Sequence, residues 1–327
     1  MKIAIIYNEE KINIAKEEMY RMGKPDYEPL IDIRNALEDE GCKVVLVDGN
    51  DNIIYKMKRE KPDLIFNLFA GTKGYIQSYI PIVSEMLGIP FTGSDALTHS
   101  LALNKVFTNE ILMSEGIPTP GFIPAKDLNY NLPSSLSFPL IVKPCRGGSS
   151  KGITKDSLVN STEPLNAAIS RILSLGYEAL ISEFIAGREL TIGIIGNDDP
   201  IIMPILETDF TSSSVDFFTD EFKDEVGYWT SQTSVAVLSA QEENAVKDSA
   251  LRTYRALGCL DYGRVDIRLG SDGSAYVIDF NSLPGIYPQY SAFSRIAEEA
   301  GWSFKDFIVK ILECTLQRYM LLPIDQN

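Results

Sequence analysis

Acidic and amide side chains near residue 270 have a spacing that suggests metal chemistry. Asp272-Gly273 predicts a two-residue hairpin turn, because both central positions of such a turn favour φ > 0. Counting outward from the turn places Asp266 opposite Asp279, and Arg264 then faces Asn281. Two carboxylates that face each other across paired strands repel unless a cation lies between them. Carboxylate and amide oxygens suit Mg²⁺, although a solvated polar face that carries two acids is the alternative.

The other face of the same hairpin is expected to be wholly apolar. The same count pairs Val265 with Phe280, Ile267 with Ile278 and Leu269 with Tyr276. One apolar and one polar face are typical of strands that alternate between a core and a more accessible side.

A second candidate region contains a lysine and a loop of small residues. A buried-type strand over 138–144 carries Lys143 near its end, and the loop 145–152 follows directly. Backbone N–H groups of such a loop can turn toward an anion, and Arg146 and Lys151 add positive charge to it. The pattern indicates a phosphate-binding loop, with an ordinary flexible surface loop as the alternative.

Lys105 and Glu189 are weaker candidates when each is taken alone. Lys105 lies just inside a helix predicted over 101–115, where a lone lysine is usually solvated. Glu189 follows a strand predicted over 178–185, and it could accept two hydrogen bonds from a ribose diol. The backbone at 183–185 could pair with an adenine edge. For Glu189 the alternative is a surface glutamate on a strand.

The elements that must position these residues fall into an N-terminal part and two later parts. In the first hundred residues, strands alternate with helices, which predicts a parallel α/β sheet with ligands at the strand C-termini. The strands are expected over 3–7, 43–47 and 63–68, and the helices over 29–40 and 52–61.

Beyond residue 100 the pattern changes to α+β. Long alternating strands from 188 to 280 predict an antiparallel sheet, which a helix over 241–257 interrupts, and a helix over 304–319 closes the chain. We therefore expect an N-terminal α/β domain (1–100), a small central α+β domain (101–187) and a C-terminal α+β domain (188–327).

Composition excludes several classes of partner. The 327 residues include 30 Lys+Arg and 45 Asp+Glu, a net charge of −15 that repels nucleic acid and anionic lipid. No stretch has the length of a membrane span, and the N-terminal apolar run is too short for a signal peptide. The 4 cysteines are scattered, which favours a reducing, cytoplasmic compartment. Because the chain has 1 histidine, His99, a mechanism that needs several imidazoles is excluded.

Taken together, the motifs of this chain resemble, in their order and spacing, those of the ATP-grasp superfamily, specifically the D-alanine–D-alanine ligase family. The resemblance runs from about Asn67 to Glu313. The matching segments are 74–77, 88–94, 103–105, 141–144 with the loop after it, 187–191, 263–266 and 279–285.

The resemblance implies a fold and a role for each matching residue. The fold is the three-domain ATP-grasp fold. Lys105 and Lys143 would hold the phosphates of ATP, the segment Glu183, Phe184 and Ile185 would bind adenine, and Glu189 would bind the ribose. Arg264 would lie near the transferred phosphate, and Ser149, with Ser150 beside it, near the first substrate. Asp266, Asp279 and Asn281 would be the ligands of Mg²⁺, for which Mn²⁺ can substitute.

The departures from the family pattern gather at the amino-acid site. Residues 8–11 stand where the family has a glycine-rich turn with Ser and Glu, and Glu9 or Glu10 could serve as the glutamate. Tyr290-Ser291 replaces the Ser-Leu pair that holds the second amino acid's carboxylate. The loop over 212–229 aligns poorly, so Lys223 is only a candidate for its phosphate-binding lysine.

The expected activity is that of an ATP-dependent carboxylate–amine ligase that works through an acyl phosphate. Its partners would be small carboxylates and amines such as amino acids or small peptides, and a homodimer is expected because ligases of this family are often dimers. The alternatives are D-alanine–D-alanine ligase proper in cell-wall precursor synthesis, a kinase-like ATP-grasp enzyme, and a nucleotide-binding regulator without catalysis. The intact lysine, arginine and metal-ligand positions argue against the regulator.

Overall fold

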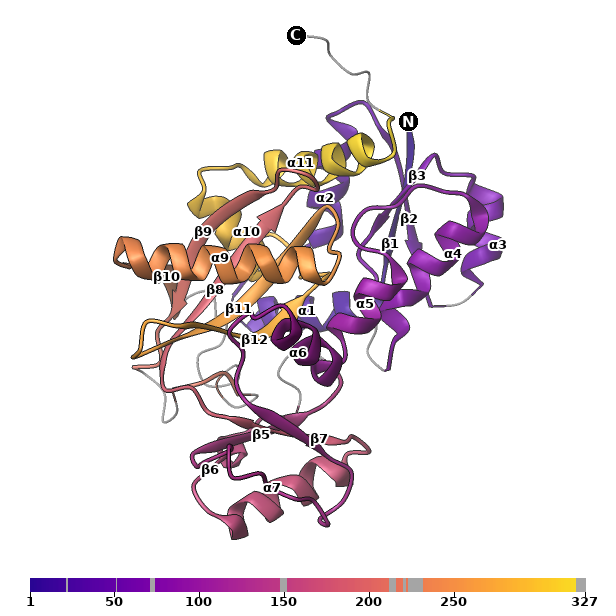
Figure 1. Ribbon diagram of the computed structural model, residues 1–327. Helices are drawn as coiled ribbons and strands as arrows, with labels where there is room; N and C mark the ends of the chain where they lie inside the picture. The colour runs from indigo at the N-terminus through magenta and orange to yellow at the C-terminus, as the bar shows by residue number, and fades with distance from the viewer. Residues whose placement is uncertain are drawn as a thin grey trace.

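The computed structural model describes residues 1–21, 23–50, 52–70, 74–147, 152–211, 216–219, 222 and 232–321. Within these residues the strands form three sheets, which Figure 1 shows with helices packed around them. None of the helices in the described part combines the length and the apolar character that a membrane span requires.

The N-terminal sheet is parallel, with strand order β2-β1-β3. Its strands are β1 (Lys2–Tyr7), β2 (Lys43–Asp48) and β3 (Leu64–Asn67). The accompanying helices are α1 (Glu9–Arg21), α2 (Pro29–Glu38), α3 (Ile53–Glu60) and α4 (Tyr79–Leu87), the last preceded by a short 3-10 turn, η1 (Ile76–Ser78). The predicted strands and the helices α2 and α3 are confirmed. Sequence reasoning did not predict α1 or α4.

The helix predicted over 101–115 is present as α6 (Lys105–Ser114), but its predicted start was wrong, because residues 101 and 102 belong to a preceding helix, α5 (Ala96–Ala102). Asn104 lies between them in extended conformation, and its side chain accepts a hydrogen bond from the N–H of Phe107. An asparagine that caps a helix in this way starts a new helix, so Lys105 is the first residue of α6.

The central sheet is small and has strand order β4-β7-β5-β6. Its strands are β4 (Phe122–Ala125), β5 (Leu140–Pro144), β6 (Leu158–Val159) and β7 (Ala179–Glu183), with η2 (Lys155–Ser157) and α7 (Thr162–Ser174) beside them. Leu140 and Val142 point into an apolar cluster with Ile169 of α7. Since side chains alternate along a strand, Lys143 points to the opposite face.

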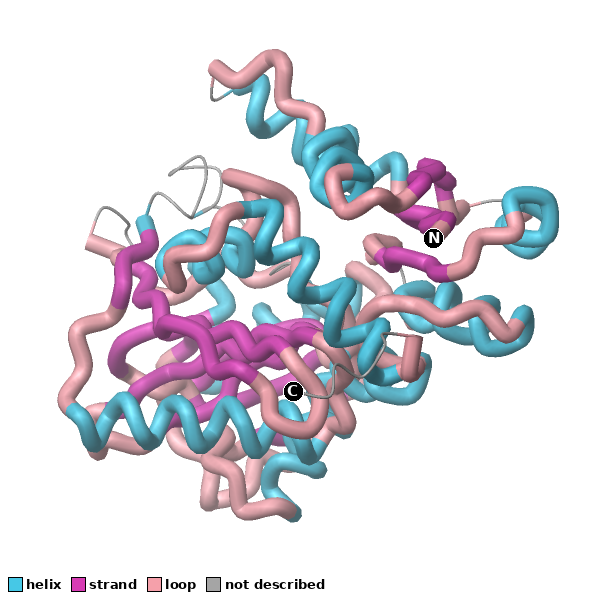
Figure 2. The backbone as a smooth tube through the Cα atoms, turned by 90° about the horizontal axis from the view of Figure 1, so that it is seen from above, coloured by secondary structure: helices cyan, strands magenta, loops and turns pink. Residues whose placement is uncertain are grey.

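The C-terminal sheet is antiparallel, with strand order β10-β9-β8-β11-β12. Its strands are β8 (Gly187–Ile195), β9 (Ile201–Thr208), β10 (Thr233–Val235), β11 (Tyr262–Gly270) and β12 (Ala275–Asn281). The helices are α9 (Ala240–Ala256), α10 (Ala292–Glu299) and α11 (Phe304–Arg318). Helices lie on both sides of this sheet, as the view from above shows (Figure 2). The apolar side chains of β8 and β11 pack against α9.

The β11–β12 hairpin has the predicted register at its open end only. Arg264 pairs with Asn281, and Asp266 pairs with Asp279. Nearer the turn, Ile267 pairs with Val277, and Leu269 with Ala275. The predicted pairs of Ile267 with Ile278 and of Leu269 with Tyr276 were therefore wrong.

The turn explains the shift in register. The N–H of Gly270 donates to the carbonyl of Ser274 at 3.0 Å, and Gly273 has φ +78°. The connection is therefore the longer three-residue turn that ends in a left-handed glycine. Ile278 is the extra residue of a β-bulge that restores the register beyond it.

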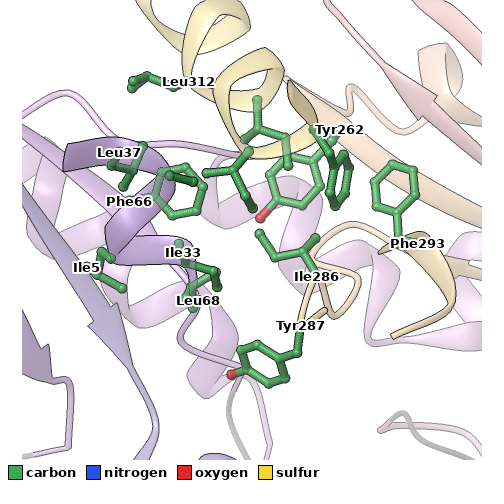
Figure 3. Packing of buried hydrophobic residues seen from close by; sticks show 14 of the residues in the cluster. Ile5, Ile33, Leu37, Phe66, Leu68, Tyr262, Ile286, Tyr287, Phe293 and Leu312 are labelled. Atoms are coloured by element: carbon green, nitrogen blue, oxygen red, sulfur yellow. The ribbon is translucent and has the colours of Figure 1, made fainter. Parts of the chain in front are cut away.

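One large apolar cluster joins the two ends of the chain. Ile33 and Leu37 of α2 and Phe66 of β3 lie in the same cluster as Leu312 of α11 and Phe293 of α10 (Figure 3). The N-terminal sheet and the C-terminal sheet therefore share a core, while the central sheet has a cluster of its own.

Candidate active site

The polar face of the C-terminal sheet gathers most of the predicted site residues. Along β11 the alternating residues Arg264, Asp266 and Arg268 share one face. Their neighbours in the register are Asn281 and Asp279 of β12, and Thr191 and Glu189 of β8. The opposite face of the same strands is apolar and covered by α9, so the polar side chains can meet a ligand only on the side away from that helix.

Asp266 is held by four hydrogen bonds. Arg264 donates to both of its oxygens, from Nε at 2.9 Å and from Nη2 at 2.8 Å. The hydroxyl of Thr191 donates at 2.7 Å and Nδ2 of Asn281 at 3.0 Å. The carboxylate is thus fixed in orientation and balanced in charge by the arginine beside it.

Asp279 has a separate cation. Nζ of Lys105, at the start of α6, lies 2.5 Å from its Oδ1. The repulsion expected between the two opposed carboxylates is therefore relieved in the protein by Lys105 and Arg264. Two carboxylates and an amide form a small set of hard oxygen donors, and it fits Mg²⁺ that takes its remaining ligands from phosphate and water. Across the described chain, no group of three or more His, Cys, Asp or Glu side chains is arranged to hold a metal by itself.

Lys143 reaches the same face from the central sheet. Its Nζ donates to the carbonyl of Ile278 at 3.1 Å. Ile278 is the bulge residue, so the departure from regular pairing supplies the acceptor. Burial, followed by the charge of Lys105, lowers the pKa of Lys143 to about 8, while Asp279 and Glu189 oppose that shift. Lys105 of α6 and Lys143 of β5 thus both lie beside the pair of carboxylates, Asp266 and Asp279.

Glu189 is buried and paired with a residue that sequence reasoning missed. Nη1 of Arg268 donates to its Oε2 at 2.9 Å. Burial raises the pKa of Glu189 to about 7, against the lowering effect of Arg268. The surface-glutamate alternative is therefore wrong. A signal for Arg268 existed, because the alternation that places Arg264 and Asp266 on the polar face also places residue 268 there.

The segment between β7 and β8 has part of its backbone bonded within the protein. The N–H of Glu183 donates to the carbonyl of Gly121 at 2.9 Å, and the N–H of Phe184 to the carbonyl of Pro139 at 3.1 Å. The Glu183 carboxylate accepts from the N–H of Gly121 at 2.9 Å. The side chain of Glu183 thus clamps β4 to β7, and only the remaining backbone groups of 183–185 are suited to a base edge.

The single histidine lies against the loop that follows Asn281. Nδ1 of His99 is 2.7 Å from the hydroxyl of Ser282, and Nε2 of Gln77 contacts both groups, at 3.2 and 3.3 Å. Burial lowers the pKa of His99 to about 4, so the ring is neutral near pH 7. Sequence reasoning did not place His99 here, because residues 99 and 282 meet only in the folded chain.

Comparison with known proteins decides the family. The family model described as D-ala D-ala ligase C-terminus matches residues 111–313, more than half of the chain. A D-alanine–D-alanine ligase of Carboxydothermus hydrogenoformans is 34% identical over 294 residues, which cover 87% of this chain and 91% of the relative. The chain belongs to the D-alanine–D-alanine ligase family.

Two further proteins are similar to this chain over most of its length. An uncharacterized protein of Sinorhizobium fredii is 30% identical over 87% of this chain and 86% of its own length. The crystal structure of a D-alanine–D-alanine ligase of Bacillus anthracis complexed with ATP has a TM-score of 0.75, with 24% identity, over 98% of this chain and 99% of its own. The fold is the ATP-grasp fold, as expected, and the chain is an ATP-dependent ligase that forms a C–N bond.

In this member of the D-alanine–D-alanine ligase family, the segments that departed from the family pattern are in part connected through α1. Glu9 and Glu10 begin α1 directly after β1. The hydroxyl of Tyr290 donates to Oε2 of Glu18 on α1 at 2.6 Å, and the hydroxyl of Tyr27 to the carbonyl of Pro288 at 2.8 Å. Helix α1 and the segment after it therefore cover the loop that replaces the family's Ser-Leu region.

Four of the residues singled out in the sequence lie outside the described part of the chain. They are Ser149, Ser150 and Lys151 of the glycine-rich loop, and Lys223. In the described first part of the loop, Gly147 has φ +103°, and the guanidinium of Arg146 lies 5.4 Å from the ring centre of Tyr75.

Proposed function

We propose that this ligase phosphorylates a small carboxylate with Mg²⁺ and ATP and then joins the acyl phosphate to an amine of an amino-acid-like substrate. The observation that carries the proposal is the meeting of Lys105 and Lys143 with Asp266 and Asp279 on one polar face. Such a group of lysines and paired acids suits a metal–triphosphate, whose transfer depends mainly on positioning and charge. Phosphate release that requires both an acid and an amine tests the proposal, and release with the acid alone would indicate a kinase instead.

The phosphate and metal roles follow from the geometry of that face. We assign Asp266, Asp279 and Asn281 as the Mg²⁺ ligands, with Mn²⁺ as a substitute. When bound, the metal would neutralise phosphate charge. Lys105 is held on Asp279, and Lys143 lies at the bulge beside it, so both would reach phosphate oxygens with small movements. Arg264, fixed by its two bonds to Asp266, would face the transferred phosphate.

The nucleoside would lie along the segment between the central and C-terminal sheets. Because the N–H groups of Glu183 and Phe184 already have protein acceptors, we assign the carbonyl of Glu183 and the N–H of Ile185 to the adenine edge. Glu189, the third residue of β8, would accept the ribose hydroxyls. Ser149 and Ser150 would close over the first substrate, as their position in the glycine-rich loop implies.

The amino-acid site supports a product other than D-alanyl-D-alanine. Tyr290 adds a ring where the family has a small hydroxyl, and it is bonded to Glu18 of α1. A pocket that loses a polar partner for a carboxylate discriminates by orders of magnitude against that ligand. We expect D-alanine alone to be a poor substrate relative to another amino-acid pair. Steady-state kinetics across a panel of pairs tests this, and D-alanine as the best substrate by kcat/KM would return the chain to cell-wall precursor synthesis.

Assembly, compartment and domain limits are proposals of the same kind. We propose a cytoplasmic homodimer, whose interface would include the exposed apolar side chains of α4 and α5: Ile82, Met86 and Leu97, which are 46, 71 and 66% exposed. Light scattering of the purified protein tests the dimer, and a monomeric mass at working concentration would contradict it. The three sheets support division into 1–100, 101–187 and 188–327. Limited proteolysis tests this division through cleavage in the connections that follow α5 and precede β8.

A further inference from the structure

Arg268 is a buried cation that no part of the proposed chemistry uses. Only 3% of its surface is exposed. Nη1 donates to Oε2 of Glu189 and to the carbonyl of Asp216, both at 2.9 Å, and Nη2 donates to the carbonyl of Gly187 at 2.8 Å. Its guanidinium also lies 4.7 Å from the ring centre of Phe184. A charge buried this deeply is costly unless it is paired and hydrogen-bonded, so the contacts define one orientation of the guanidinium.

These contacts tie two neighbouring parts of the nucleotide site to one side chain of β11. Phe184 belongs to the segment 183–185 that would bind adenine, Gly187 is the first residue of β8, and Glu189 is the residue assigned to the ribose. The rigid fork of a guanidinium can hold several acceptors in fixed relative positions, which a flexible ammonium cannot do equally well. Arg268 therefore sets the position of the Glu189 carboxylate relative to the segment 183–185.

We propose that Arg268 is a positioning residue that presents Glu189 to the ribose hydroxyls of ATP and so determines selectivity for a nucleotide with an intact diol. Arg268 holds Oε2, and Oε1 is the oxygen that meets the ribose. The inference rests on the proposed function, because it requires Glu189 to be the ribose ligand. The inference adds Arg268 to the ribose site. It also assigns to that site the selectivity for the sugar, which the phosphate-binding and metal-binding residues do not control.

The test compares ATP with 2′,3′-dideoxy-ATP as the phosphate donor. KM and kcat are measured for both nucleotides in the wild type, Arg268→Met, Arg268→Lys and Glu189→Gln. The matched control is Arg188→Met. Arg188 pairs with Glu207 through Nε at 2.7 Å and Nη2 at 2.5 Å, and adjacent strand residues point to opposite faces, so it lies on the far side of the sheet from Glu189. Thermal denaturation confirms that each variant is folded.

The expected result is a change in selectivity with little change in kcat. The wild type should prefer ATP by about tenfold in KM, the effect of one or two hydrogen bonds to a carboxylate. In Arg268→Met the preference should fall to about twofold or less, because KM for ATP rises while KM for the dideoxy nucleotide stays nearly the same. Arg268→Lys should keep an intermediate preference, and Arg188→Met should keep the wild-type ratio.

The other outcomes separate the two levels of the proposal. If Arg268→Met raises both KM values equally, or if it fails to fold and Arg268→Lys keeps the full wild-type ratio, Arg268 is a structural residue only and the inference is overturned. If Glu189→Gln loses the selectivity but Arg268→Met retains it, Glu189 binds the ribose without help and the inference fails alone. If the wild type does not distinguish the nucleotides, the ribose role of Glu189 fails as well, while the phosphate and metal assignments are untouched.

Discussion

Substitution of Asp266 by asparagine should remove most of the activity without unfolding the protein. Asparagine has the same shape and can still accept from Thr191, whose hydroxyl lies 2.7 Å from Oδ1 in the wild type. It cannot balance the charge of Arg264, which donates to both carboxylate oxygens. The variant thus loses the ionic half of a bidentate pair and one anionic metal ligand while the backbone pairing of β11 is retained.

The structure sets the size of the effect. Both side chains of the pair are largely buried, with 18% of Arg264 and 20% of Asp266 exposed, so solvent screens the interaction only in part. Hydrogen bonds to charged groups contribute about 1.5–3 kcal/mol each. A combined loss of about 3–4 kcal/mol in the transition state corresponds to a fall of roughly 10²–10³ in kcat/KM. The Mg²⁺ concentration for half-maximal rate should also rise.

The assay is phosphate release at saturating acid and amine, with ATP varied to obtain kcat/KM and Mg²⁺ varied in a second series. Asp272→Asn is the matched control, because Asp272 lies at the tip of the same hairpin and accepts from the N–H of Ser274 and the hydroxyl of Tyr276, both at 3.0 Å, away from the carboxylate pair. It should change kcat/KM by less than about twofold. A folded Asp266→Asn variant with near-normal turnover and an unchanged Mg²⁺ curve would refute the metal assignment.

Three further predictions follow from other contacts. Lys143→Ala should abolish tight ATP binding, whereas Glu189→Ala should weaken it more mildly, because an ion pair with phosphate is stronger than hydrogen bonds to neutral hydroxyls. Calorimetry of ATP binding measures both effects. Negligible effects in both variants would place the nucleotide elsewhere. Because the pKa of Lys143 is lowered to about 8 in the free protein and a bound phosphate favours its charged form, ATP binding should take up a proton above about pH 8 and weaken as pH rises further. Calorimetry in two buffers of different ionisation enthalpy measures that uptake, which should vanish in Lys143→Arg; buffer-independent heats in the wild type would contradict it. Finally, Asp261→Asn should lower the free energy of unfolding, measured in urea, by about 3–5 kcal/mol. The carboxylate of Asp261 is fully buried, and it accepts hydrogen bonds from Arg318 at 2.8 and 3.0 Å and from the N–H of Gly93 at 2.8 Å. The exposed Asp248→Asn should cost under about 1 kcal/mol, and equal losses in the two variants would contradict the role of burial.

Much of the fold could be predicted because local patterns report it directly. The alternation of strands and helices before residue 100 and the long antiparallel strands after 188 were read correctly, because a period of two or of about 3.6 residues is visible within one segment. The helix break at Asn104 was missed because the apolar pattern continues through it. Only the cap shows that α5 and α6 are separate helices.

The hairpin shows how two local errors can cancel. The sequence predicted a two-residue turn and no bulge, whereas the structure has a longer turn and a bulge at Ile278. Each departure adds one residue to one side of the count, so Asp266 and Asp279 still face each other. The carboxylate pair was therefore predicted correctly, while the apolar pairs nearer the turn were not.

By itself the sequence determined which side chains share a strand face and in which order the family motifs occur. Only the tertiary structure decided which of these faces meet. Lys105 reaches Asp279 and Lys143 reaches the carbonyl of Ile278 because the central elements pack against the C-terminal sheet. The pairing of Arg268 with Glu189 and of Tyr290 with Glu18 likewise joins residues far apart in the chain. The physical reason is that periodicity is a property of neighbouring residues, whereas a contact between distant segments depends on how whole sheets and helices pack.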